Sequence, residues 1–236
     1  MNGLTDIHQH ILWGMDDGAQ TPQMMREMLR EARDQQSRRI VATPHIYPGF
    51  KPFERSLYAE RLAEAQEYCE QNRLGIEVLS GAEIAWTYNT ADALFRRKIP
   101  TINNTDHVLI ELWHDISWRE VRTAVKSLLH EGFTPMLAHV ERYRCFVLQP
   151  ERALEMREEL SVHYQVNADT VLANNRFFVR RFVDKMLEAR GFDALASDAH
   201  DCEFRPQRLR EAWEALKIRC GAEYADSLVN FGGILK

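Results

Sequence analysis

The feature that most constrains the fold of this chain is a regular alternation of short apolar runs with longer segments of helical spacing. The apolar runs are rich in β-branched residues, which is typical of buried strands. They fall at residues 4–12, 39–45, 76–85, 107–112, 133–139, 162–167 and 192–197. The helical segments fall at residues 22–35, 53–72, 90–97, 118–131, 151–160, 174–190 and 206–219. Strand followed by helix, repeated seven times, predicts a parallel β/α architecture.

Residues at the ends of the helical segments support these boundaries. Thr21 followed by Pro22 is a typical N-cap with proline at the first helical position. Gly75, Gly132 and Gly191 come just after three of the segments, where a left-handed residue is expected to end a helix.

Seven β/α units come close to a closed TIM-like barrel, and an open doubly wound sheet is the structural alternative. No linker, repeat or change of composition divides the 236 residues, of which 45% are hydrophobic. A chain of this size can bury a full core without structural metal or disulfides. We therefore expect a single domain spanning residues 1–236.

Charge and composition exclude several classes of protein. The net charge of −5 argues against a general nucleic-acid or anionic-membrane binder, so neither partner is expected. No run approaches the roughly 18 apolar residues of a membrane span, and no secretory signal precedes the first apolar run. The four cysteines are scattered and form no CxxC pair, which is typical of a reduced, cytoplasmic protein.

Side chains of the kind that bind metal ions stand at the ends of six of the seven expected strands or in the loops that follow. Reactive groups of β/α barrels gather at these carboxyl ends, which open on one face. The candidates are His8, His10, Asp17, His45, Glu83, Glu111, His139, Asp198 and His200. The sixth run, which ends near Asn167 and Asp169, offers no obvious ligand.

The number and type of these ligands predict more than one metal ion. His8 and His10 are two residues apart and so project from one face of a strand. Zinc takes about four ligands and manganese or iron up to about six, so nine protein ligands imply two or three ions. Imidazole and carboxylate without thiolate fit Mn²⁺, Fe²⁺ or Zn²⁺, and the residues do not choose among them.

The motifs that carry these ligands resemble those of the PHP (polymerase and histidinol phosphatase) family. They are HQH at 8–10, DDG at 16–18, TPH at 43–45, GAE at 81–83, the glutamate of LIE at 111, AHVERY at 138–143 and SDAH at 197–200. Within the family, the DDGA, GAE and HVERY strings resemble the CpsB/CapC type of bacterial protein-tyrosine phosphatases from capsule and exopolysaccharide operons.

This resemblance implies a distorted seven-stranded (β/α) barrel with a trinuclear, usually manganese-dependent site. Position by position, it implies a first ion on His8, His10, Glu83 and Asp198, a second on Glu83, Glu111 and His139, and a third on Asp17, His45 and His200, with Glu83 bridging. Arg142 and Arg205 match the arginines with which the family binds phosphate. The implied reaction is hydrolysis of a phosphomonoester by a hydroxide that bridges two ions. The implied substrate is phosphotyrosine on a cognate bacterial tyrosine kinase.

Other functions compete with this interpretation. Histidinol phosphatases and other PHP phosphoesterases share the ligand set, and a metal-binding module without turnover is a further alternative. Amidohydrolase barrels also begin with His-x-His but typically use a lysine on strand four, where this chain has Glu111. Cys202 and Arg208 have the Cys-x5-Arg spacing of cysteine phosphatases, yet Pro206 and the lack of glycine between them argue against a phosphate-binding loop.

Aromatic side chains near the loops could distinguish phosphotyrosine from small phosphate esters by stacking on its ring. The candidates are Tyr47, Phe50, Trp86, Tyr88, Trp113 and Tyr143.

Overall fold

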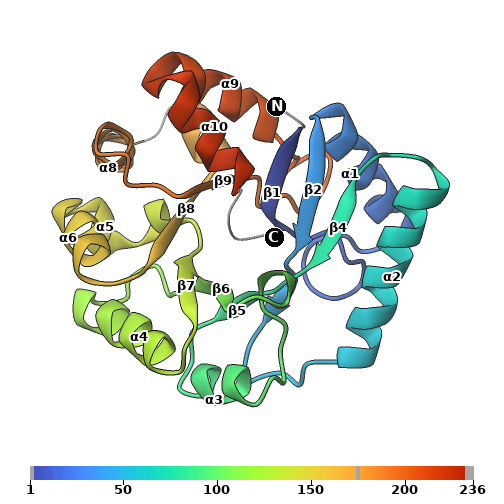
Figure 1. The fold of residues 1–236 in the computed structure, drawn as a ribbon, viewed down its shortest axis with the longest axis horizontal. Helices are drawn as coiled ribbons and strands as arrows, with labels where there is room; N and C mark the ends of the chain where they lie inside the picture. The colour runs from blue at the N-terminus through green and yellow to red at the C-terminus, as the bar shows by residue number, and fades with distance from the viewer. Residues whose placement is uncertain (1–2, 174–175, 232–236) are drawn as a thin grey trace.

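Parallel strands curl into a ring in the computed structural model, which describes residues 3–173 and 176–231. Within these ranges the strands are Leu4–Gln9 (β1), Ser37–Ala42 (β2), His45–Ile46 (β3), Glu77–Ser80 (β4), Glu83–Ala85 (β5), His107–Glu111 (β6), Thr134–Leu137 (β7), His163–Asn167 (β8) and Ala194–Ala196 (β9). They form one sheet in the order β1-β2-β4 and another in the order β3-β5-β6-β7-β8-β9. A parallel bridge between Gln9 and Ala199 brings β1 beside the end of β9 and closes the ring (Figure 1). This confirms the distorted seven-unit barrel and excludes the open doubly wound sheet.

Two of the expected strands are broken, which divides the barrel into two sheets. β2 ends before Pro44, which has no N–H to donate to a neighbouring strand, and β3 begins after it. β4 ends before Gly81, whose N–H and C=O both bond the Tyr58 hydroxyl, at 2.9 and 3.0 Å. After the breaks β3 pairs with β5, so that His45 lies directly beside Glu83.

The helices surround the ring of strands (Figure 1). Within the described residues they are Pro22–Asp34 (α1), Arg55–Gln71 (α2), Thr90–Phe95 (α3), Trp118–His130 (α4), Arg144–Val147 (α5), Glu151–Glu159 (α6), Ala168–Leu172 (α7), Phe177–Glu188 (α8), Leu209–Cys220 (α9) and Ala222–Asn230 (α10), with 3-10 turns at Ile102–Asn104 (η1) and Val140–Arg142 (η2). All seven expected helical segments contain a helix. Residue 174, the expected start of the sixth, lies outside the described residues, as do the first two and last five positions of the expected 1–236 domain.

The ends of the helices follow the expected signals with two exceptions. The Thr21 side chain accepts the N–H of Met24 at 3.2 Å and caps α1. Gly132 follows α4 with a φ of +83°, as expected. The prediction for Gly75 is wrong: Arg73, with a φ of +51°, is the left-handed residue that ends α2, and the N–H of Leu74 bonds the carbonyl of Cys69 at 3.0 Å. The prediction for Gly191 is wrong: Arg190 takes the left-handed conformation, with a φ of +51°. The N–H of Gly191 then bonds the carbonyl of Met186 at 2.7 Å, so the left-handed residue that ends the helix lies one position earlier than expected.

The interior of the ring is apolar along most strands and polar along β8. The interior apolar cluster consists of Ile7, Val41, Leu79, Ile102, Leu109, Met136, Ala138, Ala194, Ala196 and Phe231. Alternate side chains of β8, Tyr164 and Val166, pack outward against the surrounding helices. Gln165 and Asn167 lie between them and are buried as well. The polar face of β8 therefore points toward the carboxyl end of the barrel interior, where the candidate ligands lie.

None of the helices within residues 3–173 and 176–231 combines the length and the apolar character that crossing a bilayer requires.

Candidate metal centre

The structure brings the expected ligands together at the carboxyl ends of the strands. Three overlapping groups have ligand atoms within 4.8 Å of one another: His8 with His10, Glu83 and Asp198; His10 with Asp17, His45 and His200; and His45 with Glu83 and Glu111. The ninth candidate, His139, has its Nε2 2.7 Å from Glu83 and 3.6 Å from Glu111. The assignment of each residue to a particular ion stays a prediction.

Glu83 lies at the centre of the arrangement, and its side chain is 1% exposed. Its Oε2 is 3.2 Å from His8 Nε2, 3.4 Å from His10 Nε2 and 3.0 Å from His45 Nδ1. None of these contacts has hydrogen-bond geometry, and Oε2 has no hydrogen-bond partner among the described residues. A buried carboxylate oxygen that faces several ring nitrogens in this way fits a shared metal ligand.

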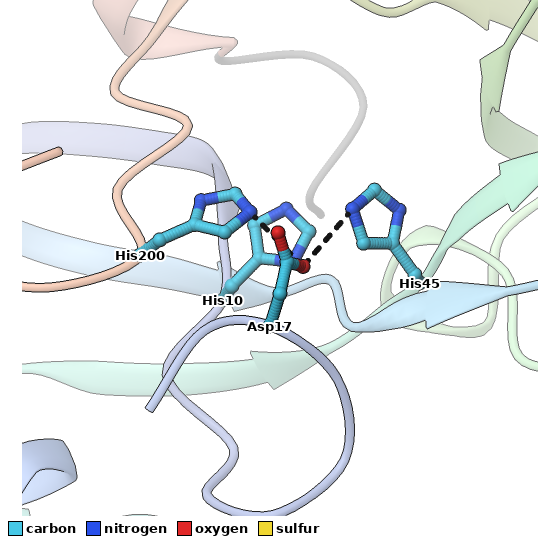
Figure 2. Close-up of side chains that lie close together, drawn as sticks. All are labelled: His10, Asp17, His45 and His200. Carbon is cyan, nitrogen blue, oxygen red and sulfur yellow. Dashed lines mark ion pairs between the residues drawn. The ribbon is translucent and has the colours of Figure 1, made fainter. Parts of the chain in front are cut away.

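A second group stands at the mouth of the site, where Asp17 lies between two histidines (Figure 2). Asp17 Oδ1 is 3.4 Å from His45 Nε2 and 3.5 Å from His200 Nε2. The Asp17 side chain is 64% exposed, whereas that of His200 is 2% exposed. The group therefore has His200 on the buried side and Asp17 at the surface. This side of the centre is accessible to a substrate.

Both expected phosphate-binding arginines converge on Asp198. Arg142 and Arg205 each donate an Nη2 hydrogen bond of 3.0 Å to Asp198 Oδ2, and Asn167 donates one of 2.7 Å to the same oxygen. The other oxygen, Oδ1, faces His8 and His10. Each arginine side chain is more than one third exposed, and an arginine has five N–H donors. Donors thus remain free beside the ligands for an anionic group.

Gln165 supports two of the candidate ligands at once. Its Oε1 accepts hydrogen bonds from His8 Nδ1 at 3.2 Å and from the backbone N–H of His139 at 2.8 Å. Its Nε2 donates to Asn167 Oδ1 at 2.7 Å, which continues the chain to Asp198. With Nδ1 of His8 donating, Nε2 of that ring keeps its lone pair toward Glu83.

Asp16 orients His10 in the same way from the other side. Its Oδ2 accepts from His10 Nδ1 at 2.7 Å and from the N–H of His45 at 2.8 Å. The loop passes so close that a Cβ on Gly18 would lie 2.2 Å from the His10 carbonyl oxygen, so only glycine fits there. Burial alone would raise the pKa of Asp16, but the hydrogen bond and charge of His10 hold it below its usual range.

Two candidate ligands have strained backbones. His139 and Asp198 adopt left-handed conformations, with φ of +33° and +55°. Such conformations cost roughly 1–3 kcal/mol for a residue with a side chain and persist where surrounding contacts impose them. The bonds from Gln165 to His139 and from the arginines to Asp198 are contacts of that kind.

The shifted pKa values of the site predict how the stability of the metal-free protein depends on pH. Burial and the charge of Glu83 raise the pKa of Glu111 to about 7. Burial would lower the pKa of His10, but its hydrogen bond to Asp16 and the nearby carboxylates of Asp198 and Glu83 raise it well above 6.5. A group whose pKa is raised by folding stabilises the protein below its unfolded pKa, and this contribution is lost as pH rises through the folded pKa. Chelator-treated protein should therefore become less stable toward urea as pH rises through neutrality.

In this experiment Glu111→Gln should remove the part of the stability loss that occurs as pH rises from the unfolded to the folded pKa of Glu111. A metal-free stability that rises through neutral pH would contradict the assignment.

The rival cysteine chemistry finds no support in the geometry. Burial and the nearby Glu31 raise the pKa of Cys202 to about 12, so its thiol is protonated at neutral pH. The backbone N–H groups of Glu203, Phe204 and Arg205 do not form an open phosphate loop, because all three bond Asp201 Oδ1.

The residues that support the candidate ligands are not evident from the sequence motifs. Gln165 and Asn167 lie on the strand that offers no ligand, and their only sequence signal is that they alternate with the outward-facing Tyr164 and Val166. Asp16 precedes the candidate ligand Asp17 within the DDG motif. The motif alone does not show which of these two aspartates faces the centre. Of the six aromatic candidates, Tyr143 is fully buried, and its hydroxyl accepts the N–H of Leu112 at 3.1 Å.

The family model and the curated relatives that match this chain point to the same family. The model of a family described as capsular polysaccharide synthesis, CpsB/CapC, matches residues 4–232. The tyrosine-protein phosphatase CpsB of Streptococcus agalactiae serotype V is 31% identical, with 99% of this chain and 98% of that protein aligned. The tyrosine-protein phosphatase YwqE of Bacillus subtilis is 29% identical, over 93% of this chain and 86% of its own.

A solved structure supports the same conclusion. It comes from a study of YwqE from Bacillus subtilis and CpsB from Streptococcus pneumoniae, which are described as unique metal-dependent tyrosine phosphatases. It superposes with a TM-score of 0.85 at 28% identity and covers 98% of this chain and 96% of its own. The family resemblance of the sequence motifs is thereby confirmed, and this chain belongs to the CpsB/CapC family of capsular polysaccharide synthesis proteins.

Proposed function

We propose that this protein is a metal-dependent protein-tyrosine phosphatase. The observation that carries the proposal is the convergence of nine metal-type ligands and two arginines on one face of the barrel. The curated relatives named as tyrosine-protein phosphatases, and the solved relative described as metal-dependent, support it. Glu111 ends β6, which is the fourth of the seven expected strands, and it belongs to one of the ligand groups. A glutamate in place of the lysine that is typical there favours a phosphatase over an amidohydrolase.

The residues present fit a centre of divalent ions. His8, His10, Glu83 and Asp198 would hold one ion, Glu83, Glu111 and His139 a second, and Asp17, His45 and His200 a third, with Glu83 shared. Imidazole and carboxylate donors without thiolate suit Mn²⁺, with Fe²⁺ or Zn²⁺ as alternatives. Such ions supply Lewis acidity and lower the pKa of a water molecule toward neutrality.

The protein's own groups position the phosphate. Arg142 and Arg205 place guanidinium donors beside Asp198, where they would bind the non-bridging oxygens and offset the charge that grows in the transition state. Gln165 and Asp16 hold His8 and His10 in fixed orientations, so the ligands need little rearrangement. The leaving group is a tyrosine phenolate with a pKa near 10, which needs less protonation than an alkoxide.

The biological setting is part of the proposal. We infer that the substrate is phosphotyrosine on a cognate bacterial tyrosine kinase in capsule or exopolysaccharide biosynthesis, because the family is named for capsular polysaccharide synthesis. The four cysteines are free, which fits a reducing compartment such as the cytoplasm. We further propose that the whole chain, residues 1–236, acts as one domain.

The test compares two substrates on protein that is stripped with chelator and reloaded with Mn²⁺. Metal-dependent hydrolysis that favours a phosphotyrosine peptide over histidinol phosphate is the expected result. Turnover of histidinol phosphate alone would indicate that the protein is a histidinol phosphatase. No turnover of either substrate would leave an amidohydrolase or a binding module without catalysis.

Gln165→Leu should weaken metal binding by about 10–100-fold, as loss of a supporting partner of a metal-bound histidine typically does. Leucine keeps the volume of the side chain but removes the acceptor shared by His8 and His139. Gln165→Glu keeps an acceptor at this position and should retain most of the affinity. Competition with a fluorescent chelator measures both variants, and equal affinity of Gln165→Leu and wild type would contradict the assigned role.

Cys202→Ser should leave activity unchanged within about twofold, because a protonated thiol is a poor nucleophile and Cys202 is not among the candidate ligands. Phosphatase assays of the Mn²⁺-loaded variant check this. An inactive Cys202→Ser protein with intact fold and metal content would replace the metal mechanism with a cysteine one.

A further inference from the structure

A cavity of about 440 Å³ opens directly beside the candidate metal centre. Its wall includes His45 and Glu111, which also belong to the centre, and the aromatic side chains of Tyr47, Trp86 and Trp113. This volume lies within the roughly 300–1,000 Å³ of small-molecule pockets. A phosphate held by the centre would therefore direct its ester group into a space lined by aromatic rings.

The three aromatic residues come from three loops that end neighbouring strands. Tyr47 follows β3, Trp86 follows β5 and Trp113 follows β6, and β3, β5 and β6 are adjacent in the sheet. The Trp86 N–H donates to the Glu111 carbonyl at 2.8 Å, which ties the second loop to the third beside a candidate ligand. The parallel register of the barrel thus brings these rings together on the side of the centre formed by His45 and Glu111.

The loop that carries Trp113 is fixed although the side chain is exposed. The N–H of Leu112 donates to the Tyr143 hydroxyl at 3.1 Å, and the carbonyl of His114 accepts from Arg144 at 2.8 Å. The Trp113 side chain is nevertheless 66% exposed. A large apolar side chain held in water on a rigid loop is typical of a binding surface, because little conformational entropy is lost when a ligand covers it.

The other aromatic residues near the site are placed differently. Phe50 and Tyr88 are 74% and 87% exposed and lie outside the wall of this cavity, while Tyr143 is fully buried. Tyr88 is only two residues from Trp86, so it offers a matched control on the same loop.

We propose that this cavity receives the aromatic ring of the phosphorylated tyrosine, and that Tyr47, Trp86 and Trp113 make the site select aryl over alkyl phosphates. The inference rests on the proposed phosphatase function and adds to it the residues that read the leaving group. An alkyl phosphate would leave the three rings in water, whereas a phenyl ring would pack against them and displace water from apolar surface.

The experiment measures binding, so that it does not depend on turnover. Isothermal calorimetry on Mn²⁺-loaded protein compares phenylphosphonate with methylphosphonate, which present the same anionic group. Wild type should bind phenylphosphonate at least about tenfold more tightly, and Trp113→Ala should reduce that ratio by about two- to tenfold, as loss of an aromatic contact does. Trp113→Phe should restore most of the preference, and Tyr88→Ala should leave it unchanged.

Trp86→Leu provides a second variant whose folding is checked by circular dichroism, because Trp86 packs partly against the core. Equal affinity of wild type for both phosphonates, or an equal loss of preference in Tyr88→Ala, would overturn the proposal. If the wild-type protein in either case still hydrolyses phosphotyrosine with Mn²⁺, the phosphatase function stands and only the cavity assignment fails. Binding of neither phosphonate would overturn both.

Discussion

Glu83→Gln should cost roughly a thousandfold or more in kcat/KM and remove metal from the protein. One Glu83 oxygen faces three histidines and the other lies 2.7 Å from His139, so a single carboxylate serves most of the centre. Glutamine is neutral and replaces one oxygen with an NH₂ group that cannot bind a cation. The loss follows because metal ions supply several kcal/mol of transition-state stabilisation, and each 1.36 kcal/mol is about tenfold in rate.

Metal content by plasma mass spectrometry and phosphotyrosine-peptide kinetics measure the two effects together. Glu77→Gln is the matched control, because Glu77 is exposed at the opposite end of the same expected strand. A Glu83→Gln protein that keeps its full metal content and activity would show that the carboxylate is structural.

Arg142→Ala should lower kcat/KM by about 10²–10³-fold while the metal content stays near that of wild type. This is the usual cost of removing one preorganised donor to a developing negative charge. Asp198 would keep its hydrogen bonds from Arg205 and Asn167, so the ligand should stay in place. Competitive inhibition by inorganic phosphate should weaken in parallel, because the same donor binds the product.

Arg144→Ala is the control for this substitution, since Arg144 is exposed two residues further along the same segment. Equal losses in the two variants would indicate a general effect of charge on substrate attraction. Loss of metal from Arg142→Ala would make the arginine a support for Asp198 and not a binder of phosphate.

The fold could be predicted from the sequence because the alternation of period-two and helical patterns extends along the chain. Details that depend on single backbone groups could not. Pro44 and Gly81 divide two expected strands, and neither interrupts the apolar pattern. Arg190 takes the left-handed position expected for Gly191, since the bond from the Gly191 N–H to Met186 decides where the helix ends.

The last helix was also absent from the expected set. α10 follows α9 after Gly221 alone, which leaves no loop to mark a new element. It presents Tyr224, Ala225, Leu228 and Val229 to the core, and it packs against β1 and β9. Its stripe of apolar residues is short, and its position against β1 depends on a strand far away in the sequence.

Ligand types could be predicted because histidine and carboxylate recur where the strands of a barrel end. Their partners could not, since hydrogen bonds between strands depend on register. Gln165 reaches His8 from a strand 157 residues away, and Asn167 reaches Asp198 in the same manner. An amide facing a barrel interior is the one local signal, and it becomes informative only once the direction of β8 is known.

The most direct test of the central claim is a titration of Mn²⁺ into chelator-stripped protein, with phosphotyrosine-peptide hydrolysis and bound metal measured at each step. Turnover should be negligible without metal and should rise as the sites fill, to a plateau at two or three ions per chain. Full activity in excess chelator, with no bound metal, would contradict it.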